Sequence, residues 1–398
     1  MTEPIIYTVR RDPLEARGFF PANSGVDLSD KEDWTRLGGP AIPHGEVESG
    51  LVLNEAFPDV AARTQTFLDT IRKPRLRLTL VGLGDVGGTL LTALKLLSGL
   101  SVGTDPDETG KTGGCGHPPL QGVPEIAEIG IYDPNEALCR RWELELNQIL
   151  DRPEPRIVLR SPDALFDCDV FLFTASRGVP PLGASGDVRM AQLEANREML
   201  KPYAALARAS RFSGLFCQIS DPVDLLARCV FLQSNRDEVG SYDFRGLLPE
   251  QIVGFGLGVM QARAAYMARR LGADCPRLRA YGPHGAQLIV ANDPVDYDAE
   301  LSAELTRRTV GANLEVRALG FKPYIAPAVS SAALSILSLL RGEPFLGAVP
   351  MGGVYFGCRS RLTDRGFAPV REDLHPALEA RLEKAWKKLR EAEPLCGI

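Results

Sequence analysis

Short apolar runs alternate with longer helical runs along the middle of this chain. Gly, Pro, Asn or Asp residues flank the short runs, a pattern typical of strands buried on both faces. The longer runs repeat apolar residues at helical spacing. This alternation predicts an α/β fold, a Rossmann doubly wound parallel sheet with helices on both faces. The expected strands are 76–81, 126–132, 156–159, 170–175 and 214–220, and the expected helices are 90–97, 189–209 and 222–232.

The pattern changes near residue 252, after which helices are separated by mixed strand and loop segments. The change predicts a second, α+β domain. We expect an N-terminal extension at 1–75, a nucleotide-binding domain at 76–232 and a substrate domain at 233–398. The expected helices are 60–71 in the extension and 259–271, 297–309, 330–341 and 374–391 in the last domain, with an extended segment at 352–361.

A glycine motif stands between the first apolar run and its helix. The sequence LRLTLVGLGDVGG places Gly82, Gly84 and Gly87 at G-x-G-x-x-G spacing. In a dinucleotide-binding fold the first glycine permits a tight turn, the second admits the pyrophosphate, and the third packs helix against strand. The N-terminus of the helix presents free N–H groups to the phosphates, and Asp85 and Val86 within the motif are expected to border the cofactor. The order of strand, glycines and helix predicts a dinucleotide site; the alternative is an ordinary glycine-rich turn.

An acidic residue is expected at the end of the second strand, where it binds the adenosine ribose. Asp133 follows the apolar run 126–132. It comes late because the segment 98–124, which is rich in Gly, Pro and Asp, is interpreted as an inserted surface loop. A carboxylate at this place repels a 2′-phosphate, so Asp133 predicts NAD rather than NADP. The alternative is a turn residue that ends the strand.

The composition is typical of a globular protein. The 398 residues are 44% hydrophobic and 24% charged, which suits a large buried core. The net charge of −6 and the lack of a basic run argue against a nucleic-acid partner. The first residues are polar and contain no apolar signal segment, and no apolar run reaches the length of a membrane span. We therefore expect a cytoplasmic protein without a membrane partner.

The cysteines predict free thiols. The eight cysteines are scattered without C-x-x-C spacing, and most lie in apolar runs. This distribution is typical of buried thiols in a reducing compartment. Cys115 and His117 lie close together in the inserted loop, but two ligands without a second pair are weak support for a metal, and we expect none.

Several further motifs resemble the lactate/malate dehydrogenase family over most of residues 76–392. In that family, the residues matching Thr174, Ala175 and Asn196 border the cofactor. The motifs are the strand end Phe173-Thr174-Ala175-Ser176, Arg189 followed by Asn196, the turn QISDPVD at 218–224, the helix start GLGVMQAR at 256–263, and YGPHG at 281–285.

The resemblance implies hydride transfer between NAD(H) and a small 2-hydroxy or 2-oxo acid, in a homo-oligomer. His284 would be the general acid and base. Arg263 would bind the substrate carboxylate as a bidentate fork. Arg189 would act from a mobile loop that closes over the substrate. The alternatives are a turn histidine, an arginine on a solvated helix face and an exposed arginine at a loop end.

Two positions depart from the family pattern. Met260 stands where the family has the aspartate that pairs with the catalytic histidine, and Asp221 stands where it has an asparagine that binds substrate. Three hypotheses follow: a dehydrogenase with a rearranged site, an oxidoreductase acting on an amino or imino acid, and an NAD-binding protein without catalysis.

The substitution at Asp221 suggests that the missing carboxylate has moved. We expect Asp221 either to pair with His284, favouring the imidazolium, or to receive a cationic substrate group. The alternative is that Asp221 caps a helix that begins at Pro222.

Overall fold

The computed structural model describes residues 6–9, 51–54, 57–98, 124–149, 154–177, 188–285, 287–321, 326–351, 353–363, 366–370, 373–392 and 396. Most of the expected insertion at 98–124 therefore lies outside the described residues, as does the Cys115–His117 pair. Most of the loop that leads to Arg189 also lies outside them.

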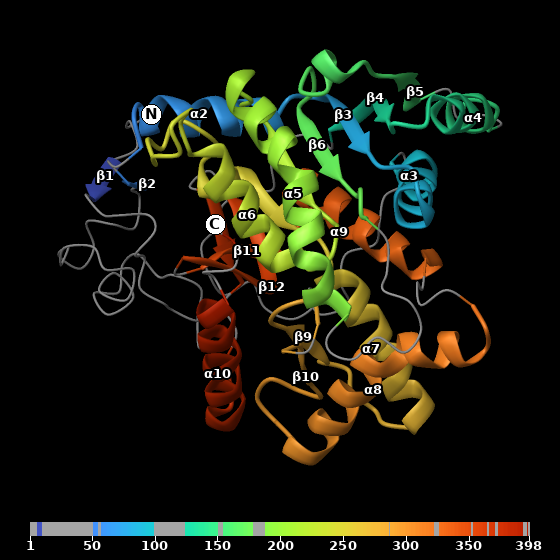
Figure 1. The fold of residues 1–398 in the computed structure, drawn as a ribbon. Helices are drawn as coiled ribbons and strands as arrows, with labels where there is room; N and C mark the ends of the chain where they lie inside the picture. The colour runs from blue at the N-terminus through green and yellow to red at the C-terminus, as the bar shows by residue number, and fades with distance from the viewer. Residues whose placement is uncertain are drawn as a thin grey trace.

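Six parallel strands form the centre of the fold (Figure 1). Their order in the sheet is fifth, fourth, third, sixth, seventh and eighth, counted along the chain. This is the 3-2-1-4-5-6 order of a doubly wound nucleotide-binding sheet, and it confirms the predicted fold class. The strands are β3 (Arg75–Val81), β4 (Glu125–Tyr132), β5 (Arg156–Leu159), β6 (Val170–Phe173), β7 (Leu215–Gln218) and β8 (Ile252–Gly254).

Three antiparallel strands extend the same sheet: β11 (Phe345–Met351), β12 (Val354–Thr363) and β13 (Gly366–Pro369). The link is the pairing of Ala348 in β11 with Gly254 in β8. Since β8 lies after residue 232, the sheet continues past the expected division between the two domains.

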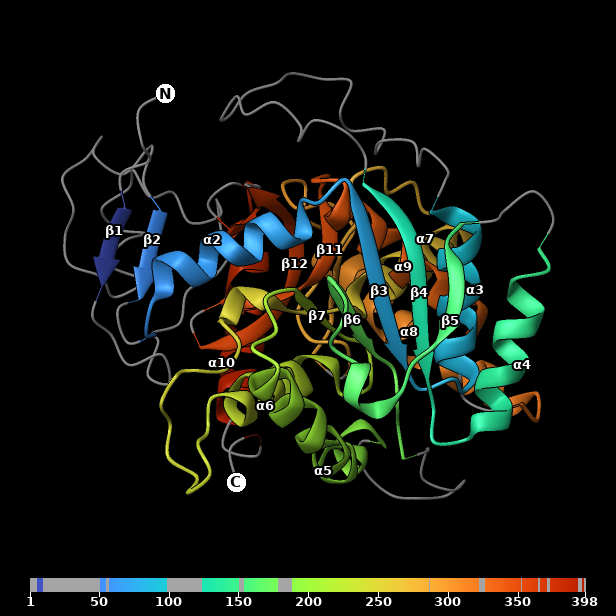
Figure 2. The same cartoon turned by 90° about the horizontal axis from the view of Figure 1, so that it is seen from above.

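Helices cover both faces of the sheet. In Figure 2, α5 (Val188–Ala209) and α6 (Val223–Ser234) lie on one side, and α3 (Asp85–Leu97) and α9 (Ser330–Leu340) lie on the other. The central strands β6 and β7 are buried along their whole length, as expected for strands covered on both sides. Three further helices are α2 (Val60–Ile71), α4 (Glu136–Leu146) and α10 (Pro376–Ala392).

A second hydrophobic cluster lies outside the main sheet. It joins α7 (Leu257–Leu271), α8 (Ala299–Ala318) and the antiparallel pair β9 (Arg279–Tyr281) and β10 (Ile289–Ala291). The loop of that pair carries His284. The remaining elements are the parallel pair β1 (Ile6–Val9) and β2 (Leu51–Asn54), and the 3-10 helices η2 (Pro162–Ala164), η3 (Pro249–Gln251) and η4 (Ala326–Val329).

Most expected elements are present, and their boundaries move where tertiary packing decides. Helix α3 begins at Asp85 rather than at residue 90, because Gly84 is its N-cap residue and Gly87 lies in its first turn. Helix α8 runs to Ala318, well beyond the expected end at residue 309. The expected helix at 60–71 and strand at 156–159 match the structure.

Candidate active site

The glycine motif forms the turn between β3 and α3 that the sequence predicts. Gly82 has a φ of +94°, which favours glycine. A Cβ atom at Gly87 would lie 1.8 Å from the carbonyl oxygen of Gly82, so only glycine permits this contact of helix and strand. A Cβ atom at Gly84 would meet no atom within 4 Å, so the space before the helix N-terminus is open. Asp85 and Val86 occupy the first turn, with Asp85 exposed.

Asp133 lies directly after β4 and is tied to the glycine motif. Its Oδ2 accepts a hydrogen bond of 2.9 Å from the backbone N–H of Leu83, and its Oδ1 accepts one of 2.9 Å from that of Asn135. The carboxylate is only half-buried. It therefore stands beside the phosphate-binding turn, as a ribose-binding residue would.

Thr174 and Ala175 follow β6 and pack against the same turn. The Thr174 hydroxyl is buried and donates to the carbonyl oxygens of Val81 and Gly82, at 3.0 and 2.7 Å. A Cβ atom at Gly82 would lie 2.6 Å from the backbone nitrogen of Ala175. The Thr174 side chain thus fixes the turn from within, and its place beside the cofactor stays a prediction.

Asn196 is fully buried on α5 and joins the ends of two strands. Its Oδ1 accepts from the backbone N–H of Arg177 at 2.9 Å, after β6. Its Nδ2 donates to the carbonyl oxygen of Asp221 at 2.7 Å, after β7. The side-chain amide therefore connects the two loops that follow these strands, and the contact of Asn196 with a cofactor stays a prediction.

His284 and Asp221 face each other at the edge of the sheet. The Nε2 atom of His284 lies 3.9 Å from Oδ1 of Asp221, within ion-pair range and beyond hydrogen-bond range. The Asp221 side chain is 37% exposed and that of His284 is 14% exposed. The N-cap residue of α6 is Pro222, not Asp221, so the expected helix cap has the wrong register. The structure thus brings together the two residues that the sequence hypothesis paired.

Two residues from different helices fix the position of His284. Its backbone N–H donates to Oδ2 of the buried Asp224 on α6, at 2.7 Å. Its ring lies against the N-terminus of α7, where a Cβ atom at Gly256 would stand 2.0 Å from Nδ1. The absence of a side chain at Gly256 therefore makes room for the imidazole.

The position expected to carry a carboxylate lies in the second hydrophobic cluster instead. Met260 is 1% exposed and packs with the apolar residues of α7 and α8. An ionised carboxylate among those residues would carry a large desolvation cost. The apolar side chain of Met260 suits this surrounding.

Of the two arginines expected to contact the substrate, the structure describes the side chain of Arg263 but not that of Arg189. Arg263 is half-buried on α7, and its Nη1 donates to the carbonyl oxygen of Thr309 in α8, at 3.2 Å. Arg189 lies in the first turn of α5, at the end of the expected mobile loop, and its side chain lies outside the described residues.

Comparison with solved structures establishes the fold. A malate dehydrogenase from Archaeoglobus fulgidus, solved in complex with NADH, matches with a TM-score of 0.61 and 18% identity, over 81% of this chain and 100% of that one. A minor L-lactate dehydrogenase from Enterococcus mundtii matches with a TM-score of 0.60 and 16% identity, over 81% of this chain and 98% of that one.

Sequence comparison also finds dehydrogenases, in this case L-lactate dehydrogenases. An L-lactate dehydrogenase 2 from Bacillus cereus is 29% identical over 170 residues, which are 42% of this chain and 49% of that protein. The L-lactate dehydrogenase of Streptococcus equi subsp. zooepidemicus is 26% identical over 162 residues, 40% of this chain and 45% of that one. The chain is thus similar to lactate and malate dehydrogenases in fold and, over part of its length, to L-lactate dehydrogenases in sequence. No protein-family model matches it, and it spans about half the length of these curated relatives.

Two residues at this site have roles that the sequence does not predict. Asp224 lies in the turn QISDPVD and Gly256 opens the segment GLGVMQAR, and neither pattern indicates a contact with His284. Both act on His284 through tertiary contacts, which no local pattern reveals. The spacing of Asp221 and Asp224 across Pro222 was the available signal, because it places two carboxylates at one helix start.

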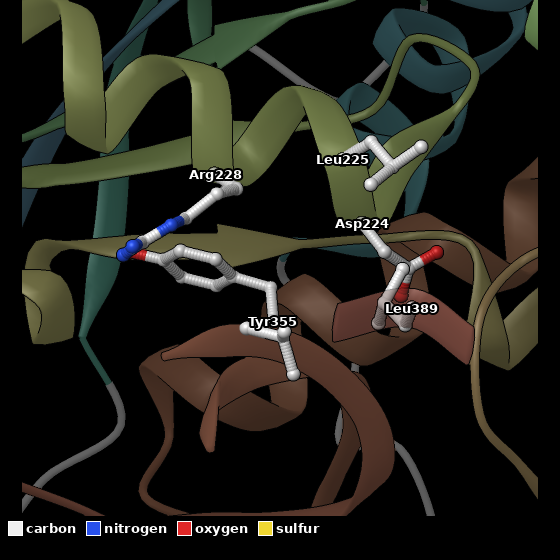
Figure 3. Close-up of a pocket in the computed structure, with 6 residues that line it drawn as sticks. Asp224, Leu225, Arg228, Tyr355 and Leu389 are labelled. Carbon is white, nitrogen blue, oxygen red and sulfur yellow. The ribbon is translucent and has the colours of Figure 1, made fainter. Parts of the chain in front are cut away.

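The surroundings of Asp224 are tightly packed. Figure 3 shows Arg228 of α6 beside Tyr355 of β12, with Leu389 of α10 nearby. The space that these residues line is too small for a water-sized molecule. Burial raises the pKa of Tyr355 well above its ordinary value, and its hydroxyl donates to the carbonyl oxygen of Pro249 at 3.0 Å. This region is structural support behind the histidine, not a ligand pocket.

The described ranges show neither a metal site nor a membrane span. Those residues contain no group of three or more side chains placed to hold a metal ion. None of the helices in the same ranges is long and apolar enough to cross a membrane.

Proposed function

We propose that this protein is an NAD-dependent oxidoreductase that transfers hydride between NAD(H) and C2 of a small 2-hydroxy or 2-oxo acid. One observation carries the proposal: a histidine faces the carboxyl edge of a doubly wound sheet whose first strand ends in a dinucleotide-binding turn. The dehydrogenase relatives support the same chemistry.

The described residues fit a dinucleotide. The open space at Gly84 and the helix N-terminus behind it suit a pyrophosphate, and the half-buried Asp133 carboxylate suits a ribose diol. NAD bound there would supply the hydride acceptor or donor. Asp133 also favours NAD over NADP, because a 2′-phosphate would meet its charge.

The chain itself supplies proton transfer and orientation. His284 would take the proton of the substrate hydroxyl in oxidation and return it in reduction. Asp224 and Gly256 hold the imidazole in place for that transfer. Arg263, two turns into α7, would bind the substrate carboxylate, and Arg189 would close over it from the loop.

A cytoplasmic homo-oligomer belongs to the same proposal. The described cysteines are free thiols, and most of them are buried, which suits a reducing compartment. Light scattering after size exclusion tests the oligomer.

A substrate screen tests the function. Purified protein is mixed with NAD⁺ and a panel of 2-hydroxy acids, or with NADH and 2-oxo acids, and followed at the nicotinamide absorbance. We expect turnover of at least one acid with NAD(H). With NADP(H) in its place, turnover of the same acid should be weaker or absent. Tight NADH binding without turnover of any acid would favour a non-catalytic NAD-binding protein.

A further inference from the structure

The central strands β6 and β7 are joined beyond the end of the sheet by side chains. Their backbones pair as far as the N–H of Ile219, which donates to the carbonyl oxygen of Phe173 at 3.0 Å. Past this bond the two chains continue as the loops that border the site. Buried backbone groups in these loops still need hydrogen-bond partners.

Two buried side chains supply such partners. The hydroxyl of Ser220 donates to the carbonyl oxygen of Ala175 at 2.6 Å. Asn196 reaches further along both chains, because its Oδ1 accepts from the N–H of Arg177 at 2.9 Å and its Nδ2 donates to the carbonyl oxygen of Asp221 at 2.7 Å. Asn196 is fully buried and Ser220 is 5% exposed, so water competes little for these hydrogen bonds.

We propose that Asn196 and Ser220 are positioning residues for proton transfer: by joining the ends of β6 and β7, they hold Asp221 opposite His284. The inference rests on the proposed hydride transfer with NAD(H) and adds two residues that act on it through the backbone. The substrate need not touch either side chain for this role.

The backbone on both sides of the Ser220–Asp221 peptide bond is held. Gln218, the last residue of β7, is fully buried, and its Nε2 donates to the carbonyl oxygen of Ser220 at 3.0 Å. The carbonyl oxygen of Asp221 is held in turn by Asn196. The turn that carries the Asp221 side chain is therefore fixed by buried side chains of β7 and α5.

The spacing across the site depends on this turn. Oδ1 of Asp221 lies 3.9 Å from Nε2 of His284. Asp224 fixes the histidine from its own side, because its Oδ2 accepts from the backbone N–H of His284 at 2.7 Å. Asn196 and Ser220 do the same for the opposite member of the pair. A displacement of about 1 Å in an active site can lower a rate by about 100-fold, so both supports should matter for proton transfer.

Hydrogen exchange tests the contacts between the strand ends without any need for turnover. Asn196→Ala removes both amide contacts, and Ser220→Ala removes the hydroxyl contact. Exchange is followed by mass spectrometry in the segments 174–177 and 219–224. We expect the amide of Arg177 to exchange faster by about tenfold or more in Asn196→Ala, and both segments to exchange faster in Ser220→Ala. Unchanged exchange in both segments would overturn the inference.

Kinetics at saturating NADH test whether these contacts serve the reaction. Asn235→Ala is the matched control, because Asn235 is also fully buried and also bridges backbone groups at 2.9 Å, at the opposite end of α6 from Asp224. We expect Asn196→Ala and Asn235→Ala both to lower Tm. Only Asn196→Ala should lower kcat, by about tenfold or more, with a smaller fold-change in KM.

Ser220→Ala removes a single hydroxyl and keeps the test decisive if Asn196→Ala fails to fold. We expect it to retain the NADH affinity of the unmodified protein, measured by calorimetry, while its kcat falls. Full kcat in Ser220→Ala, or a kcat in Asn196→Ala equal to that of Asn235→Ala, would overturn the inference and leave the hydride transfer standing. Turnover of no acid by the unmodified protein would overturn the proposed function, and the exchange data would then still decide whether Asn196 and Ser220 hold the strand ends together.

Discussion

Asp221 and His284 stand across a gap of 3.9 Å, from Oδ1 to Nε2, on two segments that are far apart in the sequence. Asp221 follows β7 of the parallel sheet, and His284 lies in the β9–β10 loop. The opposite edge of the imidazole faces Gly256, with the hydrophobic Met260 one turn further along α7. The carboxylate near this histidine is therefore on its Nε2 side, where the substrate is expected.

Replacing Gly256 with alanine should remove activity by displacing the imidazole. The new Cβ atom would lie 2.0 Å from Nδ1, so the ring must move. We expect kcat to fall at least tenfold, which corresponds to an activation free energy higher by about 1.4 kcal/mol. The affinity for NADH should not change. Gly311→Ala in α8 is the control, since its Cβ atom would meet nothing within 4 Å. Equal activity in the two variants would contradict the placement of the ring.

Asp224 should position His284 through its backbone. In Asp224→Ala the partly buried N–H of His284 loses its 2.7 Å acceptor, which costs about 1 kcal/mol of stability. Asp224→Asn keeps an oxygen acceptor and should recover much of the loss. Thermal unfolding, kcat and KM are measured for both Asp224 variants. We expect the fold-change in kcat to be larger than the fold-change in KM. If the asparagine variant is no better than alanine, the hydrogen bond is not what matters.

The motif glycines Gly84 and Gly87 should separate cofactor binding from folding. Gly87→Ala places a Cβ atom 1.8 Å from the Gly82 carbonyl oxygen, and overpacking of this kind costs about 1–3 kcal/mol or more. Gly84→Ala meets no protein atom, so the fold should keep its Tm while NADH binding weakens, because the pyrophosphate needs that space. Calorimetry and thermal unfolding check this, and full NADH affinity in Gly84→Ala would count against the dinucleotide site.

Buried thiols should resist alkylation in the native protein. Burial raises the pKa of Cys168 to about 12, and that of Cys217 well above its ordinary value. Because the thiolate is the reactive form, a pKa near 12 leaves about one thiolate in ten thousand at pH 8. Cys275 is only partly buried and should be labelled before both. Peptide mapping after iodoacetamide treatment gives the order, with denatured protein as the control; equal labelling rates would contradict the burial.

The nucleotide-binding half was predictable because its signals are local. Gly82, Gly84 and Gly87 lie within one turn, and the strand and helix beside them are adjacent in the sequence. The position of Asp133 was predictable because it comes directly after the next apolar run. The strand order was then fixed by the general rules of parallel sheets rather than by any single residue.

The substrate half was predictable only in part because its contacts are distant. His284 meets Asp224 and Gly256 through packing of α6, α7 and the β9–β10 loop, and nothing local to these residues marks that meeting. The resemblance to the dehydrogenases pointed to His284 and Asp221, but the sequence did not predict that the Asn196 and Thr174 side chains hydrogen-bond to the protein backbone.

The most direct test of hydride transfer with His284 as acid and base compares the full-length protein with His284→Gln. NADH binding is measured by calorimetry, and turnover of the best acid from the substrate panel is followed at the nicotinamide absorbance. We predict that the variant binds NADH with nearly the original affinity and loses turnover by on the order of a thousandfold, within the range usual for general acid–base catalysis. Turnover in His284→Gln equal to that of the original protein would contradict the account.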